Sequence, residues 1–202
     1  MKTKKIGVLI GSLRKESFNR KTANALVQLA GKNLEFEFID IANLPLYNQD
    51  DDSNPPKEFT QFREKIKQCD AILFFTPEYN RSVPGVLKNA IDIASRPYGQ
   101  SAWAKKPAGV ISVSIGAMGG FGANHHLRQS LVFLDMPCMQ QPELYIGNAP
   151  KIFDDSGKLI DESVKGLLTK FIQSYEQWIN TVSPEQMSIF ARQAENQAQP
   201  RQ

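Results

Sequence analysis

The sequence predicts a single α/β domain in which a parallel β-sheet carries helices on both faces. Strand-like and helix-like segments alternate five times along the chain, which is the pattern of a sheet built from β-α units. The strand-like segments are continuous apolar runs, typical of strands buried on both faces. A chain of 202 residues buries about 70% of its unfolded surface on folding, enough for one complete core.

The expected strands are short and rich in apolar residues. Residues 6–10 form an apolar run that ends in Gly-Ser, and residues 71–76 are apolar throughout except for the final Thr. In chain order the strands are expected at residues 6–10, 34–41, 71–76, 108–115 and 139–146. Because a helical segment follows each strand, neighbouring strands are expected to run parallel.

The expected helices carry apolar side chains at a spacing of 3.6 residues. The clearest pattern continues for five turns over residues 162–182. Another helix has Pro84 near its first turn, where a missing N–H costs nothing. In chain order the helices are expected at residues 19–29, 57–68, 86–94, 124–134 and 162–182. The Asp-, Asn- and Pro-rich segment 43–56 is expected to be a loop.

Residues 1–182 are expected to form this one domain, and residues 183–202 a polar C-terminal tail. The tail starts with a capping-box-like pattern at Ser183, Pro184 and Gln186 and ends in a polar stretch. A short fraying helix or a disordered segment is expected there. An arm that docks on a neighbouring subunit is the alternative.

Composition excludes several classes of protein. A charged fraction of 22% and a net charge of +3 exclude a disordered polyelectrolyte. The longest apolar runs span about five residues, whereas a membrane helix needs about twenty. Residues 1–5 lead straight into a strand-like run without a signal sequence, so a cytoplasmic protein is expected. Because the basic residues are scattered, nucleic-acid binding is not expected, and a small anionic ligand suits the charge better.

The sequence contains no convincing metal site or redox pair. His125 and His126 are adjacent and therefore point apart on a helix. A calcium loop starting at Asp50 would lack the required Gly and Glu. Cys69 and Cys138 lie beside apolar stretches, so both are expected to be small buried residues with reduced thiols.

The loop of residues 11–19 has the donors that a phosphate monoester needs. It leaves a buried strand and opens a helix, so free backbone N–H groups and the positive helix end converge there. Ser12, Arg14, Ser17 and Asn19 add two hydroxyls, a guanidinium and an amide. A helix cap would explain Ser17 or Asn19 alone. The loop lacks both Gly-Lys-Ser/Thr and G-x-G-x-x-G, so it suits a single terminal phosphate, as in FMN.

Two further loops follow the third and fourth expected strands, at the sheet edge where parallel α/β folds bind ligands. Residues 76–85 contain two prolines that fix the loop and the aromatic ring of Tyr79. Residues 114–122 are rich in glycine, which lets the backbone approach a flat ring closely. The alternatives are an exposed turn aromatic for Tyr79 and a mobile connector for the glycines.

Together these loops resemble a known family. The resemblance rests on Gly11-Ser12-x-Arg14-x-x-Ser17-x-Asn19 and on Pro77-Glu78-Tyr79-Asn80-x-Ser82-x-Pro84-Gly85-x-Leu87-Lys88-Asn89-Ala90-Ile91-Asp92. These motifs are similar to those of the NADPH-dependent FMN reductase family, which includes bacterial quinone, azo-dye and chromate reductases, and the similarity runs from residue 5 to 182. It departs from the family at Ile93, in residues 121–124 and in the tail.

The resemblance implies a flavodoxin-like three-layer sandwich with a five-stranded parallel sheet of order 2-1-3-4-5. It implies that the FMN phosphate is held by Ser12, Arg14, Ser17 and Asn19. It implies that the isoalloxazine is lined by Pro77, Glu78, Tyr79, Asn80 and Ser82, with Ser114 and Gly116 closing the site. It also implies dimers with the flavin near the interface, and a homodimer or homotetramer is expected. Apolar residues on more than one face of the expected helices 86–95 and 124–134 agree with this, for example Val86, Leu87, Ile91 and Ile93.

The function expected on this basis is FMN-dependent oxidoreduction. NADPH or NADH would reduce the flavin, which would reduce a quinone-like acceptor in a ping-pong mechanism. No acid–base dyad is needed, because the cofactor carries the chemistry, and Tyr79 would only position the substrates. The alternatives are a flavodoxin-like electron carrier, which is usually acidic, and a flavin-binding protein without its own substrate. A pI of about 8.8 argues against the carrier. Ser114 is also a weak match to a hydrolase nucleophile, because Ser112 replaces the leading Gly.

Overall fold

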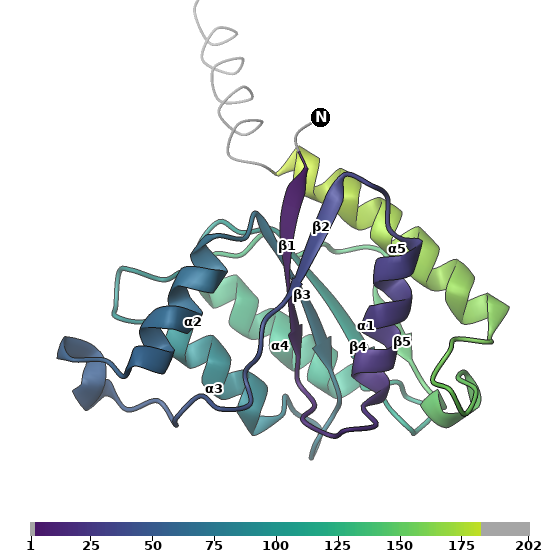
Figure 1. Cartoon of the computed structure of the whole chain (residues 1–202), viewed down its shortest axis with the longest axis horizontal. Coiled ribbons are helices and arrows are strands. Elements are labelled where there is room, and N and C mark those ends of the chain that lie inside the picture. The colour runs from purple at the N-terminus through teal and green to yellow at the C-terminus, as the bar shows by residue number, and fades with distance from the viewer. Residues whose placement is uncertain (1–2, 183–202) are drawn as a thin grey trace, which may run out of the picture.

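The structure is a computed structural model that describes residues 3–182 (Figure 1). The predicted tail, residues 183–202, lies outside the described residues. The sheet contains β1 (Lys4–Ile10), β2 (Leu34–Phe38), β3 (Ala71–Thr76), β4 (Ala108–Val113) and β5 (Leu144–Ile146). Its order is β2-β1-β3-β4-β5, and every neighbouring pair is parallel, which confirms the predicted flavodoxin-like topology.

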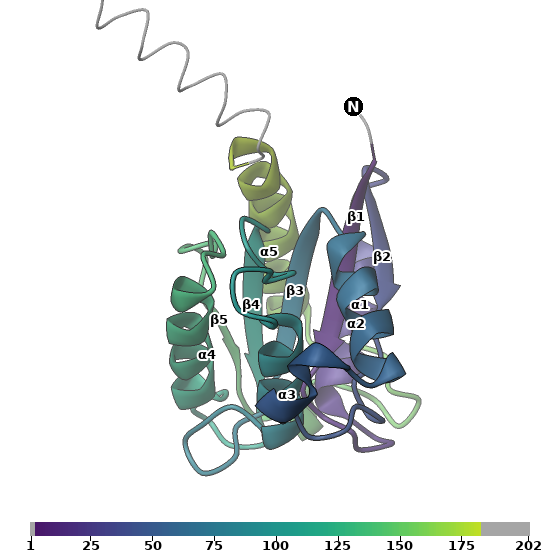
Figure 2. The same cartoon turned by 90° about the vertical axis from the view of Figure 1, so that its left-hand side faces the viewer.

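Helices cover both faces of the sheet (Figure 2). The helices are α1 (Phe18–Leu29), α2 (Lys57–Lys67), α3 (Gly85–Ala94), α4 (Phe121–Phe133) and α5 (Glu162–Thr181), with short 3-10 turns at Gln49–Ser53 and Ala149–Lys151. One core forms between the sheet and α1 with α5, and the other between the sheet and α2, α3 and α4. The buried Tyr175 hydroxyl of α5 donates to the carbonyl oxygens of Ile72 and Pro107, 2.8 and 3.2 Å away.

Three strands are shorter than predicted. β2 ends at Phe38, although Ile39 and Ile41 beyond it remain buried in the core beneath α2 and α3. β5 spans three residues instead of residues 139–146, and Pro142 in the excluded part has no N–H for the sheet. β4 ends at Val113, so residues 114–115 belong to the following loop.

α4 begins at Phe121, three residues earlier than predicted. Gly120 caps it in the left-handed conformation, with φ 77°, which glycine adopts without strain. The Glu78 carboxylate accepts a hydrogen bond of 2.9 Å from the backbone N–H of Ala123 and so satisfies one donor of the first turn. Glu78 and Ala123 both lie outside the apolar helical pattern, which begins at residue 124. The periodicity of the sequence therefore misses this first turn.

Of the apolar residues of α3 that suggested an interface, Val86 is half-buried and the other three are buried in the protein's own core, which contradicts their use as evidence of an interface. Leu87, Ile91 and Ile93 are each at most 2% exposed. Neighbouring segments cover the helix: the Trp103 indole N–H donates to the Ile91 carbonyl oxygen, and Arg63 Nε donates to the Ile93 carbonyl oxygen, both at 2.9 Å. The exposed apolar side chains of this region lie instead on α4, where Val132 is 75% and Phe133 84% exposed.

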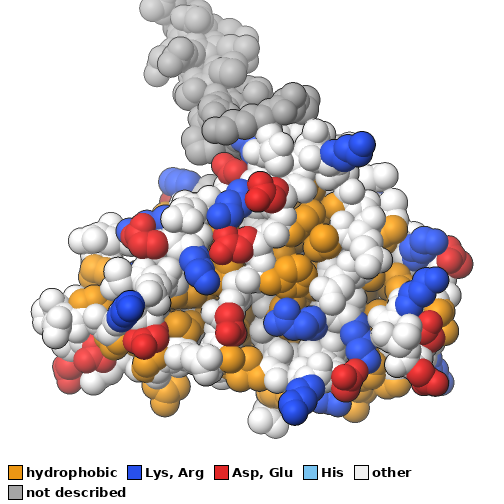
Figure 3. Space-filling model, in the orientation of Figure 1, with side chains coloured by type: hydrophobic (Ala, Val, Ile, Leu, Met, Phe, Trp, Pro, Cys, Tyr) orange, Lys and Arg blue, Asp and Glu red, His pale blue; other side chains and the backbone are white. Residues whose placement is uncertain are grey.

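The surface charges agree with the sequence, but only Cys69 of the two cysteines is buried as predicted. On the face seen in Figure 3, basic and acidic side chains are interspersed rather than gathered by sign. Cys69 is buried and Cys138 half-buried, and both thiols are free. Among residues 3–182, no helix is long and apolar enough to cross a bilayer.

Candidate functional site

The three predicted loops meet at the carboxyl ends of β1, β3 and β4. The backbone N–H of Gly11 donates to the Phe75 carbonyl oxygen at 2.7 Å. A Cβ atom on Gly11 would approach Pro77 Cδ to 3.2 Å, so the first and second loops are in close contact. The side-chain amide of Asn19 donates to the carbonyl oxygen of Val113, 3.3 Å away, and joins the first loop to the third. This is the sheet edge at which open α/β folds bind ligands.

The first loop presents hydrogen-bond donors that the protein itself does not use. Within the described chain, the backbone N–H groups of Leu13, Arg14 and Lys15 donate to no acceptor. The Arg14 side chain is exposed and makes no hydrogen bond or ion pair with residues 3–182. Ser12, at the start of the loop, is 7% exposed. Unused N–H groups and a guanidinium before a helix N-terminus form a suitable anion site.

The other two polar residues of this loop have structural contacts. The Ser17 hydroxyl accepts from the backbone N–H of Arg20 at 3.3 Å and therefore caps α1. Asn19 is 3% exposed, and its Nδ2 is engaged with β4 as described above. Its Oδ1 is buried and has no partner within residues 3–182. A buried acceptor without a partner is rare in proteins, and a hydroxyl group of a ligand would satisfy it.

The second loop is a tight hairpin. Tyr79 and Ser82 exchange both backbone hydrogen bonds, at 3.1 and 2.9 Å, and Asn80 and Arg81 between them have φ of 53° and 63°. These values are those of a type I′ turn, which fits the twist of a two-residue hairpin. The Tyr79 side chain is left 53% exposed. Glu78 turns its carboxylate toward the start of α4.

The third loop is a defined turn and not a mobile connector. Gly116 accepts hydrogen bonds from the N–H groups of Gly119 and Asn148, and its own N–H donates to Ser114 Oγ at 3.2 Å. A Cβ on Gly119 would lie only 2.7 Å from the backbone carbon of Tyr145. Glycine is therefore required where this loop packs on β5.

The structure also reveals side-chain contacts that the sequence did not predict. Adjacent His125 and His126 point to different partners, as predicted for neighbours on a helix. His126 Nδ1 lies 2.8 Å from Ser82 Oγ, and His125 Nε2 lies 2.9 Å from the Tyr145 hydroxyl. Tyr145 also donates to the Glu143 carboxylate. Burial, followed by this hydrogen bond, raises the pKa of Tyr145 well above its usual value.

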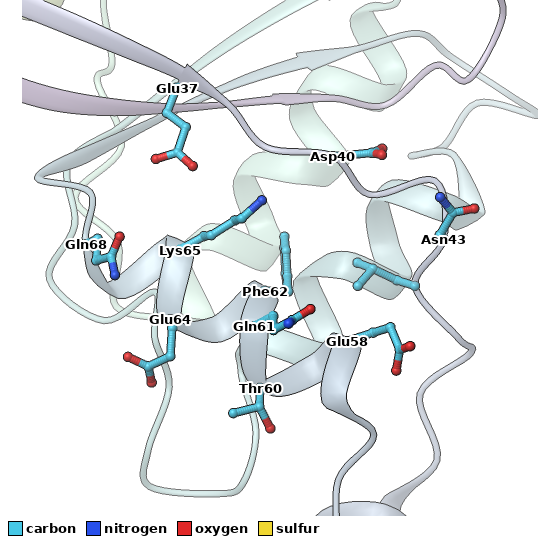
Figure 4. A pocket seen from close by; sticks show the side chains of 11 residues that line it. Glu37, Asp40, Asn43, Glu58, Thr60, Gln61, Phe62, Glu64, Lys65 and Gln68 are labelled. Carbon is cyan, nitrogen blue, oxygen red and sulfur yellow. The ribbon is translucent and has the colours of Figure 1, made fainter.

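A separate cavity of about 670 Å³ lies between β2 and α2 (Figure 4). The side chains around it include Glu37, Asp40, Glu58 and Lys65. None of the predicted site residues lines it, and it lies away from the three loops. It therefore forms no part of the candidate site.

The sequence is similar to those of several known proteins. The sequence matches the model of the NADPH-dependent FMN reductase family over residues 4–151. A quinone reductase of Pseudomonas putida is 59% identical over 175 residues, which cover 86% of this chain and 94% of that protein. A 2-hydroxy-1,4-benzoquinone reductase of a Burkholderia species is 46% identical over 87% of this chain and 96% of that protein.

A solved structure shares both the fold and much of the sequence. FerB, a flavoenzyme NAD(P)H:(acceptor) oxidoreductase from Paracoccus denitrificans, superposes with a TM-score of 0.84 and 39% identity, covering 90% of this chain and 100% of that one. An apo NADH:FMN oxidoreductase, 21% identical with a TM-score of 0.66, shares the fold. The family match and these relatives imply FMN as the cofactor and NAD(P)H as the electron donor. The chain belongs to the NADPH-dependent FMN reductase family and is an NAD(P)H-dependent oxidoreductase.

Proposed function

We propose that this protein carries electrons from NADPH or NADH, through bound FMN, to small quinone-like acceptors in a ping-pong reaction. The observation that carries the proposal is the contact between two loops. Residues 11–17 present backbone N–H groups without acceptors, and the adjoining hairpin exposes Tyr79. The first provides an anchor for a phosphate, and the second a wall for flat rings. The names of the relatives from Pseudomonas putida and Burkholderia support quinones as the acceptor class.

The first loop would hold the phosphate of FMN. Ser12, Arg14 and Ser17, with the backbone N–H groups between them, are the proposed phosphate ligands, since they supply several donors and a positive charge. Asn19 would support the site without binding the phosphate. Its Nδ2 fixes the start of α1 to β4, and its unpartnered Oδ1 is available to a ligand hydroxyl. The chemistry that FMN supplies when bound is two-electron redox chemistry at its ring system.

The second and third loops would hold the ring. The proposed contacts are Pro77, Glu78, Tyr79, Asn80, Ser82, Ser114 and Gly116. Glu78 contributes through its backbone, because its carboxylate caps α4. The rigid hairpin and the hydrogen-bonded Gly116 turn hold these groups in place before a ligand arrives, which reduces the entropy lost on binding.

The same geometry supports the ping-pong order. A ring packed against the strand ends and two loops has one of its faces against the protein. NADPH or NADH would bind to the open face of the flavin ring first, and the quinone would bind to the same face after it leaves. Tyr79 would lie beside this face. Initial rates measured while both substrates are varied should give parallel lines in double-reciprocal plots, and intersecting lines would show a ternary complex instead.

Two measurements on purified protein test whether it binds FMN and passes electrons from NADPH to a quinone. The extracted cofactor should migrate as FMN in chromatography, and NADPH oxidation should accelerate when p-benzoquinone is added. An FAD peak, or protein that stays colourless with added FMN, contradicts the cofactor assignment. Bound FMN with no turnover of NADPH would indicate an electron carrier or a binding protein.

We also propose a cytoplasmic homodimer or homotetramer. The exposed Val132 and Phe133 on α4 supply an apolar surface of the kind that subunit interfaces bury. The free thiols of Cys69 and Cys138 suit a reducing compartment. Light scattering at micromolar concentration should return a multiple of 22.7 kDa, and a monomer mass contradicts the assembly.

A further inference from the structure

The backbone of the hairpin determines which side chains share its face. Tyr79 and Ser82 exchange both of their backbone hydrogen bonds, so they are directly opposite each other on two antiparallel strands. Side chains of directly opposite residues project from the same face, with Cβ atoms roughly 5 Å apart. The exposed ring of Tyr79 and the hydroxyl of Ser82 therefore lie side by side.

This arrangement brings His126 to the same face as Tyr79. Its Nδ1 lies 2.8 Å from Ser82 Oγ, which fixes the imidazole although the side chain is exposed. Its Nε2 makes no hydrogen bond or ion pair with residues 3–182. His125 differs, since its Nε2 is engaged by the Tyr145 hydroxyl.

The contact with Ser82 fits two tautomers of His126, because the Ser82 hydroxyl can donate to Nδ1 or accept from it. A serine hydroxyl that donates to Nδ1 leaves the proton of a neutral imidazole on Nε2. In this tautomer the outward Nε2 is an N–H donor beside the exposed ring of Tyr79. This pair matches the two features of a quinone, a flat apolar ring and carbonyl oxygens at its edge.

We propose that His126 Nε2–H donates a hydrogen bond to a carbonyl oxygen of the quinone acceptor and so determines the preference for acceptors that carry carbonyl groups. The inference rests on the proposed function. Ser82 positions the imidazole, and Tyr79 provides the neighbouring apolar surface. The hydrogen bond is stronger as negative charge develops on the oxygen during reduction, so it favours turnover as well as binding.

Two substitutions distinguish the contribution of His126 Nε2, which points outward, from that of Nδ1, which contacts Ser82. In His126→Gln the side-chain amide reaches the place of Nε2 and retains a donor there. In His126→Asn the shorter amide replaces Nδ1, retaining the contact with Ser82 and losing the outward donor. The measured quantity is the ratio of kcat/KM for p-benzoquinone to kcat/KM for ferricyanide, an acceptor without a carbonyl group.

We expect this ratio to fall about tenfold in His126→Asn and to remain within about twofold of wild type in His126→Gln. His125→Asn, on the adjacent residue with a different partner, is the matched control and should leave the ratio unchanged. FMN affinity, from fluorescence titration of each FMN-free protein, checks that the cofactor site is intact. A ratio retained in His126→Asn, or lost equally in both His126 variants, overturns the inference.

Nuclear magnetic resonance provides a test that does not depend on turnover. The chain contains 2 histidines, so two imidazole patterns are expected in a long-range ¹H–¹⁵N spectrum, and Ser82→Ala assigns that of His126. The Nε2–H tautomer supports the inference, and the Nδ1–H tautomer overturns it. A wild-type protein that reduces ferricyanide but not p-benzoquinone would overturn the proposed function, and this inference with it, whereas the His126 results alone would leave quinone reduction standing.

Discussion

The side-chain amide of Asn19 and the carbonyl oxygen of Val113 are joined by a hydrogen bond of 3.3 Å across 94 positions of sequence. Val113 is the last residue of β4, and its carbonyl group lies where the strand ladder stops. The amide therefore satisfies a buried acceptor that the sheet leaves unpaired. The same hydrogen bond fixes the first loop, which ends at Asn19, relative to the third loop, which follows Val113.

Removing this amide should destabilise the fold even without a ligand. We expect Asn19→Ala to lower the free energy of unfolding by about 1–3 kcal/mol, because the Val113 carbonyl oxygen would remain buried without a donor. Urea denaturation of FMN-free protein measures this. Asn24→Ala, at an exposed position of the same helix, should change stability by less than about 0.5 kcal/mol. Wild-type stability in Asn19→Ala would show that the bond contributes nothing.

Arg14 should determine much of the affinity for FMN. Its guanidinium has no partner in the described chain, and charge-assisted bonds contribute about 1.5–3 kcal/mol. Arg14→Ala should therefore weaken FMN binding by roughly ten- to a hundredfold in fluorescence titration. Arg20→Ala, on α1, is the control, because the Arg20 guanidinium lies 5.7 Å from the centre of the Phe38 ring of β2. An unchanged dissociation constant in Arg14→Ala would remove Arg14 from the phosphate site.

Tyr79 should affect the rates of both half-reactions but not the affinity for FMN. Its ring is exposed on a hairpin closed by backbone bonds, so Tyr79→Ala removes a substrate wall without unfolding the turn. Stopped-flow measurements should show flavin reduction by NADPH and reoxidation by quinone each slowed by roughly three- to tenfold. Tyr79→Phe keeps the ring and should retain both rates. Slowing of one half-reaction alone would contradict a shared open face.

Two glycines of the third loop should respond differently to alanine. In Gly119→Ala the new Cβ would lie 2.7 Å from the Tyr145 backbone at a φ of 61°, so a loss of at least about 2 kcal/mol of stability is expected. In Gly116→Ala the nearest atom, Ser114 Oγ, is 3.9 Å away, and stability should be unchanged. Gly116→Ala should weaken FMN binding if the cofactor approaches this backbone. Thermal unfolding with and without FMN separates the two effects.

Cys69 should make stability decrease at alkaline pH. Burial raises the pKa of its thiol to about 11, whereas the thiol of the unfolded chain ionises near pH 8.5. Between these values the unfolded state has lost the proton and the folded state has retained it, so stability is complete below about pH 8 and decreases up to pH 11. Cys69→Ala should reduce this decrease by at most about 3 kcal/mol, measured by urea denaturation at pH 8 and pH 10.5. An identical decrease in the variant would assign it to other groups.

The sheet was predictable because its strands are buried on both faces. Residues 71–76 and 108–113 pack between two helical layers, and double burial gives an apolar run that can be recognised without any other information. The topology followed from the family resemblance of the loops. The start of α4 was not predictable, because the Glu78 carboxylate that caps its first turn lies 45 positions away.

The site was predictable as a set of loops, but the role of each side chain was not. A serine before a helix can cap it and still face an anion, so Ser17 fits both interpretations. The sequence shows that Ile91 and Ile93 are apolar, but not that Trp103 and Arg63 cover their helix. The contact between Ser82 and His126 spans 44 positions and leaves no local pattern.

The position of α5 has a consequence for the synthesis of the protein. One face of the sheet is covered partly by the buried side chains of this helix, Leu168, Phe171, Ile172, Tyr175 and Ile179. Its Tyr175 hydroxyl binds a carbonyl group 103 positions earlier in the chain. Until residue 179 has left the ribosome, a nascent chain that has already paired its strands exposes this apolar face. Folding is therefore completed late in translation, and the uncovered sheet is a natural substrate for chaperones.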